Sequence, residues 1–98
     1  MDEHKVWVEE NVSALDFLAW LEMQPGGKEY SYTATQSCAF ALYLKSKGLD
    51  RVFVGSALWS MFGVDTDFQI PPHVNDAVWR HPRTFAAAAR RLRSYLGE

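Results

Sequence analysis

The sequence predicts an α+β fold, mostly helical, in which about four helices and a small antiparallel β element form a single globular domain over residues 1–98. Three observations support this prediction. Several segments carry helix start and stop signals, the C-terminal segment repeats apolar residues at helical spacing, and the middle of the chain holds short β-branched and aromatic runs. The chain is also 48% hydrophobic and 14% aromatic, a composition that suits a packed core rather than a disordered segment.

The first helix is predicted from the local chemistry at its two ends. Residues 1–10 are mostly charged around an apolar triplet, which indicates a short apolar anchor or a strand. The helix then opens at residues 11–13, because Ser13 and Asp16 have the spacing of a capping box. It ends at residues 24–28, which contain a proline and two glycines.

The second predicted helix spans residues 35–48. Thr35 is a suitable N-cap, and Gly48 suits the position after the last helical residue. The preceding residues 30–33 alternate and are expected to be extended. This assignment places Cys38 at the third position of the helix.

The β element is predicted between residues 51 and 70. Residues 51–55 read as a strand, and residues 56–63 fit either a second strand or one helical turn. A turn follows, and residues 68–70 are expected to be extended because Ile70 precedes a proline.

Two helices are predicted after the β element. A proline pair opens a short helix that runs through residues 71–79. Residues 81–84 break it, and Thr84 caps the last helix. The apolar stripe of that helix consists of Phe85, Ala88, Ala89, Leu92, Tyr95 and Leu96.

Charge and composition limit the function classes. The net charge of −2 lacks the basic excess of a general nucleic-acid binder. Acidic residues concentrate in residues 1–22 and arginines in residues 80–98. We find no secretory signal pattern and no apolar run near the ~20 residues of a membrane span. With a single cysteine and hence no intramolecular disulfide, a cytoplasmic protein without a membrane partner is expected.

Cys38 is the one candidate for catalytic chemistry. A cysteine near a helix N-terminus can be a nucleophile in a hydrolase or transferase, with His4, His73 or His81 as its base. The apolar run that follows it favours a buried core residue instead. The separated histidines lack metal-site spacing, and phosphate-binding glycine motifs are absent from the sequence. We expect no metal and no cofactor, and a non-enzymatic protein is favoured.

Two groups of residues are candidates for binding. The arginines could contact phosphates or an acidic protein surface, or they could form a solvated helix face. The aromatic residues of the least regular segment could anchor a protein interface or fill the core, and they are Trp59, Phe62, Phe68 and Trp79. The candidate binding residues are Trp59, Phe62, Phe68, Arg80, Arg83, Arg90, Arg91 and Arg93.

Several segments together resemble small proteins encoded by bacteriophages and prophages. These segments are residues 17–25, 30–32, 38–44, 70–71 and 82–92. The family has no assigned catalytic residues, so the resemblance implies none for this chain. It implies a small protein that acts in the bacterial cytoplasm and binds a host factor.

The combined expectation is a non-enzymatic protein-binding module, and the resemblance alone implies that it is of phage or prophage origin. It would bind a host protein and inhibit or redirect it, and a defence system such as CRISPR-Cas is one such target. Two alternatives stay open. One is a cysteine-dependent hydrolase or transferase that uses Cys38, and the other is a weak nucleic-acid binder that uses the C-terminal arginines.

Overall fold

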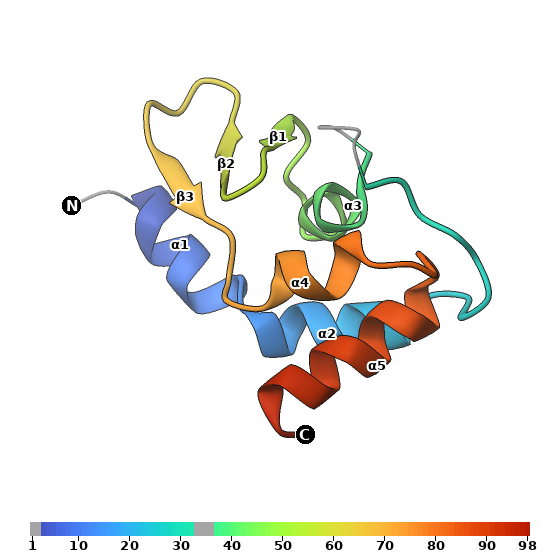
Figure 1. The fold of residues 1–98 in the computed structure, drawn as a ribbon. Helices are drawn as coiled ribbons and strands as arrows, with labels where there is room; N and C mark the ends of the chain where they lie inside the picture. The colour runs from blue at the N-terminus through green and yellow to red at the C-terminus, as the bar shows by residue number, and fades with distance from the viewer. Residues whose placement is uncertain (1–2, 33–36) are drawn as a thin grey trace.

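The computed structural model describes residues 3–32 and 37–98, and these residues form five helices and a three-stranded sheet (Figure 1). The elements in chain order are α1 (Glu3–Asn11), α2 (Ala14–Glu22), α3 (Ala39–Ser46), β1 (Val52–Val54), β2 (Leu58–Met61), β3 (Asp67–Gln69), α4 (Val74–Trp79) and α5 (Phe85–Leu96). The α+β fold and the antiparallel β element are confirmed. Helices α2, α4 and α5 lie below the sheet, where α5 packs against both α2 and α4, while α1 lies near β3 and α3 packs against β1.

Helix α1 corrects the strand alternative at residues 1–10, whereas Val8 packs against the core, as the apolar-anchor alternative expects. The apolar residues of α1 are consecutive at positions 6–8, so they form no stripe at helical spacing that would have predicted a helix, and no residue of α1 is fully buried. Instead, half-buried Val8 and Val12 pack against the core. The Asn11 side chain donates a hydrogen bond to the Trp7 carbonyl. Contacts made in the folded state therefore stabilise this helix, as is common for short helices.

The predicted helix starts at Ser13 and Thr84 are confirmed. Ser13 Oγ accepts a hydrogen bond from the Asp16 N–H at 3.0 Å, and Thr84 Oγ1 accepts one from the Ala87 N–H at 3.3 Å. These side chains satisfy N–H groups that the first helical turn leaves without a backbone partner.

The second predicted helix is shorter than expected. Thr35 lies outside the described residues, and α3 begins at Ala39 with Cys38 as its N-cap. The placement of Cys38 inside the first turn was therefore wrong. The predicted end is confirmed, because Lys47 is the C-cap and Gly48 follows with a φ of +93°. Glycine adopts this left-handed conformation without steric cost.

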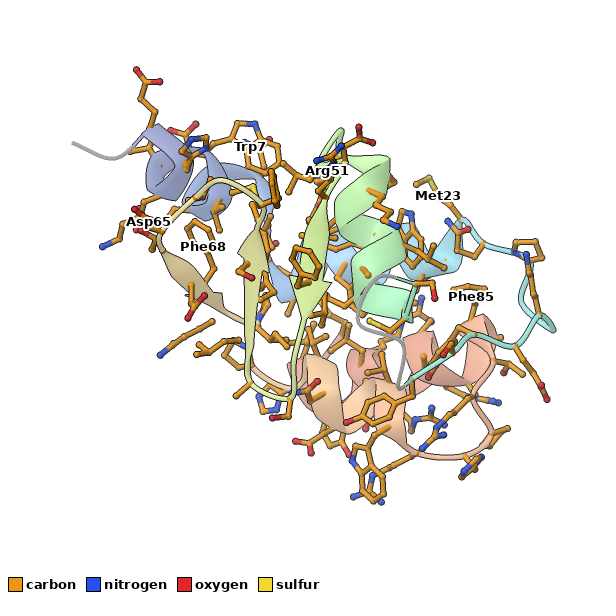
Figure 2. All side chains as sticks on the ribbon, turned by 90° about the horizontal axis from the view of Figure 1, so that it is seen from above. Trp7, Met23, Arg51, Asp65, Phe68 and Phe85 are labelled. Carbon is orange, nitrogen blue, oxygen red and sulfur yellow. The ribbon has the colours of Figure 1, made fainter. Side chains whose placement is uncertain are left out.

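The β element is a meander in the order β1-β2-β3, with both pairs antiparallel. The ambiguous residues 56–63 therefore supply a strand. Alternation along the strands turns Trp59 and Phe68 toward the core, where their ring centroids lie 4.8 Å apart. The Phe68 side chain lies between β3 and α1 in Figure 2.

An aromatic cluster forms the centre of the core between α2, α3 and α5. Phe17 is fully buried, and its ring contacts those of Trp20, Phe40 and Tyr43 at centroid distances of 5.8, 5.4 and 5.1 Å. Phe85, labelled at the start of α5 in Figure 2, extends the cluster through Trp20. Such contacts add to the free energy gained by burying the rings.

Helix α4 starts three residues later than predicted. The prolines at positions 71 and 72 precede it, and His73 is its N-cap with a φ of +71°. The His73 ring stacks on that of Tyr95 in α5 at a centroid distance of 5.5 Å. This contact covers part of Tyr95, the most exposed member of the predicted apolar stripe of α5.

Candidate functional site

The loop between α4 and α5 contains two of the predicted binding residues, Arg80 and Arg83, and a third, Arg91 of α5, donates hydrogen bonds to it. This loop runs beside the segment that follows α2, at the right of Figure 1. The Tyr30 N–H donates to the Arg83 carbonyl at 3.0 Å, and the Phe85 N–H donates to the Lys28 carbonyl at 3.1 Å. The C-terminal end of the loop is therefore held by the backbone of a segment more than fifty residues away in the chain.

Arg91 holds this loop from inside. Its Nε donates to the Ala77 carbonyl at 2.7 Å, and its Nη2 donates to the carbonyls of Arg80 and Pro82 at 3.0 and 3.1 Å. The Tyr30 hydroxyl donates to the Val78 carbonyl at 2.8 Å. The last carbonyls of a helix have no hydrogen-bond partner within the helix. Arg91 and Tyr30 thus supply donors to such carbonyls at the end of α4. The guanidinium of Arg91 is a structural group rather than a free binding group.

Arg80 and Arg83 lie on the outside of the same loop, and both contact Trp79. The Arg80 guanidinium lies over the Trp79 ring at 5.2 Å from its centroid. Arg83 Nε donates to the Trp79 carbonyl at 2.8 Å, and its guanidinium lies over the Tyr32 ring at 4.9 Å. We call Tyr32, Trp79, Arg80 and Arg83 the Trp79–Arg83 surface. Stacking on the two rings orders both arginine side chains.

The other two predicted arginines face elsewhere. Arg90 and Arg93 border a depression between α2 and α5 that also contains Glu22. Arg93 forms an ion pair with Glu22. The arginine cluster expected from the sequence is therefore divided between the α4–α5 loop and different faces of α5. Arg80 and Arg83 are the two that lie beside the exposed Trp79 ring.

The positive charge of the Trp79–Arg83 surface is not neutralised by the part of the chain that the structure describes. The ion pairs among residues 3–32 and 37–98 are Lys47–Asp16 and Arg93–Glu22. Neither Arg80 nor Arg83 pairs with a carboxylate among these residues. Their charges are therefore available to an anionic group from outside the chain.

The aromatic candidates are divided between core and surface. Trp59 and Phe68 are 1% and 7% exposed, so their prediction as binding residues is corrected: they are core residues. Phe62 is 66% exposed, and the Arg51 guanidinium lies 5.1 Å from its ring centroid. It follows β2, on an element separate from the Trp79–Arg83 surface. Trp79, at 44% exposed, is the aromatic group that accompanies the arginines.

Two residues of the Trp79–Arg83 surface were absent from the predicted binding set. Trp79 directly precedes Arg80 in the sequence, so their adjacency was a usable signal. Tyr32 lies about fifty residues away along the chain, and no local pattern connects it with Arg83. Only the packing of the segment after α2 against the α4–α5 loop brings them together.

Cys38 lies in the core rather than in an accessible site. Cys38 is 6% exposed, and burial raises the pKa of its thiol above the usual range. The backbone N–H groups of Phe40 and Ala41 favour the thiolate and only partly offset this effect. The described residues that border the adjacent pocket include no histidine. The helix N-terminus thus acts on the thiol as expected, but burial outweighs it.

We expect the Cys38 thiol to react slowly with iodoacetamide at neutral pH, because the folded protein excludes the reagent and disfavours the thiolate. The rate should lie well below that of the same chain in urea, because burial shields the sulfur from the reagent and the raised pKa lowers the thiolate fraction. Mass spectrometry of timed samples measures it. Equal rates in the folded and unfolded chains would restore Cys38 as a candidate nucleophile.

A second cluster of titratable groups joins α2 to α3. The Tyr43 hydroxyl donates to Asp16 Oδ2 at 2.7 Å, and Lys47 Nζ lies 2.5 Å from the same oxygen. Burial and the Asp16 carboxylate raise the pKa of Tyr43 above its usual range. Tyr43 therefore stays protonated and donates a hydrogen bond, so this cluster is an interhelical contact rather than a general base.

Comparisons with known proteins add no relative to this picture. No protein-family model, curated protein or solved structure matches the chain. Within the described residues, no helix combines the length and apolar character needed to span a membrane.

Proposed function

We propose that the chain is a non-enzymatic protein-binding module that contacts its partner through the Trp79–Arg83 surface. The observation that carries the proposal is the arrangement of two arginines, neither neutralised by a described carboxylate, around one half-exposed tryptophan. Tryptophan and arginine are the residues most enriched among those that dominate protein–protein binding energy.

The rigidity of the surface supports the same proposal. Arg91 and Tyr30 hold the backbone that carries Trp79 and Arg80, and the Tyr32 ring orders Arg83. A partner therefore meets side chains that are already ordered. Binding to such a surface loses less conformational entropy than binding to a mobile one.

The identity of the partner is proposed from the resemblance to phage and prophage proteins. On that basis, the chain acts in the bacterial cytoplasm and binds a host protein, whose activity it blocks or redirects. The small size of the domain suits a mechanism by occlusion, in which the bound module covers a functional surface of its partner.

Site-specific photocrosslinking tests the proposal. The photoreactive residue p-benzoylphenylalanine replaces Trp79 in one version of the full chain and Phe62 in another, since both positions are exposed aromatics on different surfaces. After irradiation in bacterial lysate, we expect a discrete crosslinked protein from position 79 that is lost when Arg80→Glu and Arg83→Glu are added.

The Phe62 version is the matched control. Equal crosslinking from both positions, or a product that does not depend on the two arginines, would contradict the assignment of the Trp79–Arg83 surface as the binding surface. No discrete product from either position would contradict the proposed binding function itself.

A further inference from the structure

We infer that the Trp79–Arg83 surface recognises an acidic protein segment, one that places carboxylates on Arg80 and Arg83 and an apolar side chain on Trp79. The inference rests on the proposed binding function and specifies the chemistry of the partner. Its basis is charge complementarity: the surface presents two guanidinium groups beside an exposed ring, and neither group pairs with a described carboxylate of its own chain.

The guanidinium groups of Arg80 and Arg83 keep hydrogen-bond donors to which carboxylates would bind. The Arg80 guanidinium makes no hydrogen bond to the part of the chain that the structure describes, and Arg83 uses its Nε for the Trp79 carbonyl. The Nη groups of both arginines therefore keep their donors. Paired guanidinium N–H groups match the geometry of a carboxylate, with which they form two parallel hydrogen bonds.

The exposed ring adds a requirement for an apolar neighbour. Trp79 is 44% exposed although it is large and apolar. Covering its free surface would contribute through the hydrophobic effect, at about 25 cal/mol for each Å² of apolar area buried. A bare polyanion would leave this area in water, whereas a protein segment with an aromatic or aliphatic residue between its carboxylates would cover it.

Charge distribution favours an acidic protein segment over a nucleic acid. Proteins that bind nucleic acid through phosphates commonly make about six to ten phosphate contacts. Here two arginines are free on this surface, because Arg91 holds the loop and Arg93 pairs with Glu22.

Fluorescence polarisation with defined probes tests the inference. The probes are a short fluorescein-labelled peptide rich in Glu and Phe, the same peptide with Gln in place of Glu, and a labelled oligothymidylate with as many negative charges. We expect the folded full-length chain to bind the Glu peptide at least about tenfold more tightly than either other probe. Its affinity for the Glu peptide should fall as the salt concentration rises.

Variants of the arginines test whether the Glu peptide binds at the Trp79–Arg83 surface. Arg80→Ala combined with Arg83→Ala should weaken Glu-peptide binding at least about tenfold, whereas Arg90→Ala should leave it unchanged because Arg90 faces the depression beside α2. Urea denaturation checks that each variant is folded. A variant pair with normal binding, or no difference between the Glu and Gln peptides, would overturn the inference.

The result is distinguishable from failure of the proposed function. Tighter binding of the oligothymidylate would assign the surface to nucleic acid and overturn the acidic-segment inference. If position 79 crosslinks to a discrete protein but the Glu peptide does not bind, the binding function stands and the partner is not recognised through an acidic segment.

Discussion

Replacing Trp59 by alanine is expected to lower the free energy of unfolding by about 3–5 kcal/mol, as large aromatic-to-alanine changes in protein cores do. Trp59 is 1% exposed, and its ring contacts those of Phe40 and Phe68 at centroid distances of 6.3 and 4.8 Å. Alanine would leave a cavity between the sheet and α3 and would remove both ring contacts. Urea denaturation followed by circular dichroism measures the change.

A second substitution at the same position separates the loss of the ring from the loss of its polar atom. Trp59 Nε1 is buried and has no hydrogen-bond partner among the described residues. Trp59→Phe removes this unsatisfied donor while it keeps an aromatic ring, so it should cost clearly less than Trp59→Ala. Both variants remove the N–H, so equal costs would show that the ring kept by Trp59→Phe restores none of the packing lost with the indole.

Trp79 provides the matched control, since it is the same residue type in an exposed position. Trp79→Ala should lower the free energy of unfolding by about 1 kcal/mol or less, in line with substitutions outside a packed core. It should nevertheless weaken binding to the Glu-rich peptide. If Trp79→Ala proved as destabilising as Trp59→Ala, the division into a core and a surface tryptophan would be wrong.

The two tryptophans also show what the sequence could predict. Both lie near the end of apolar runs, and composition alone marked each as core or interface. The pairing of β2 with β3 settles the matter for Trp59, because it turns that residue toward Phe40 and Phe68. Since residues 56–63 fitted a strand or a helical turn equally well, the sequence did not determine which side chains point inward.

Helix ends were predictable where local side chains determine them. Ser13, Thr84 and Gly48 act within a few residues of their own positions, so their roles follow from the local sequence. Helix α1 was not predictable in this way, because half-buried contacts with the core stabilise it and no apolar stripe marks it. The sequence thus predicts interactions over short separations and misses those that need the complete fold.

The candidate site divides in the same way. Arg80 and Arg83 were predicted as binding residues from composition, and the structure places them together. Arg91 was predicted with them, but its partners are carbonyls of residues 77, 80 and 82. A contact between a side chain and backbone carbonyls across a loop leaves no recognisable pattern in the sequence. The sequence therefore could not distinguish the structural Arg91 from the exposed arginines.

Arg91→Ala is therefore expected to lower the free energy of unfolding by about 2 kcal/mol. The Ala77 carbonyl is only partly reached by water and would lose its charged donor, whereas water would replace the donor at Arg80 and Pro82. Arg90→Ala is the control on the same helix and should cost less than about 0.5 kcal/mol, because its side chain is exposed. Urea denaturation of both variants measures the difference.

The same substitution should also weaken binding to the Glu-rich peptide, although Arg91 does not lie on the Trp79–Arg83 surface. Without its donors, the backbone that carries Trp79 and Arg80 is less constrained, so binding must order it at a cost in entropy. Arg91→Lys keeps the charge but replaces the planar group that spans three carbonyls. If Arg91→Lys binds as weakly as Arg91→Ala, the geometry of the loop rather than the local charge controls recognition; full binding by Arg91→Ala would contradict this role.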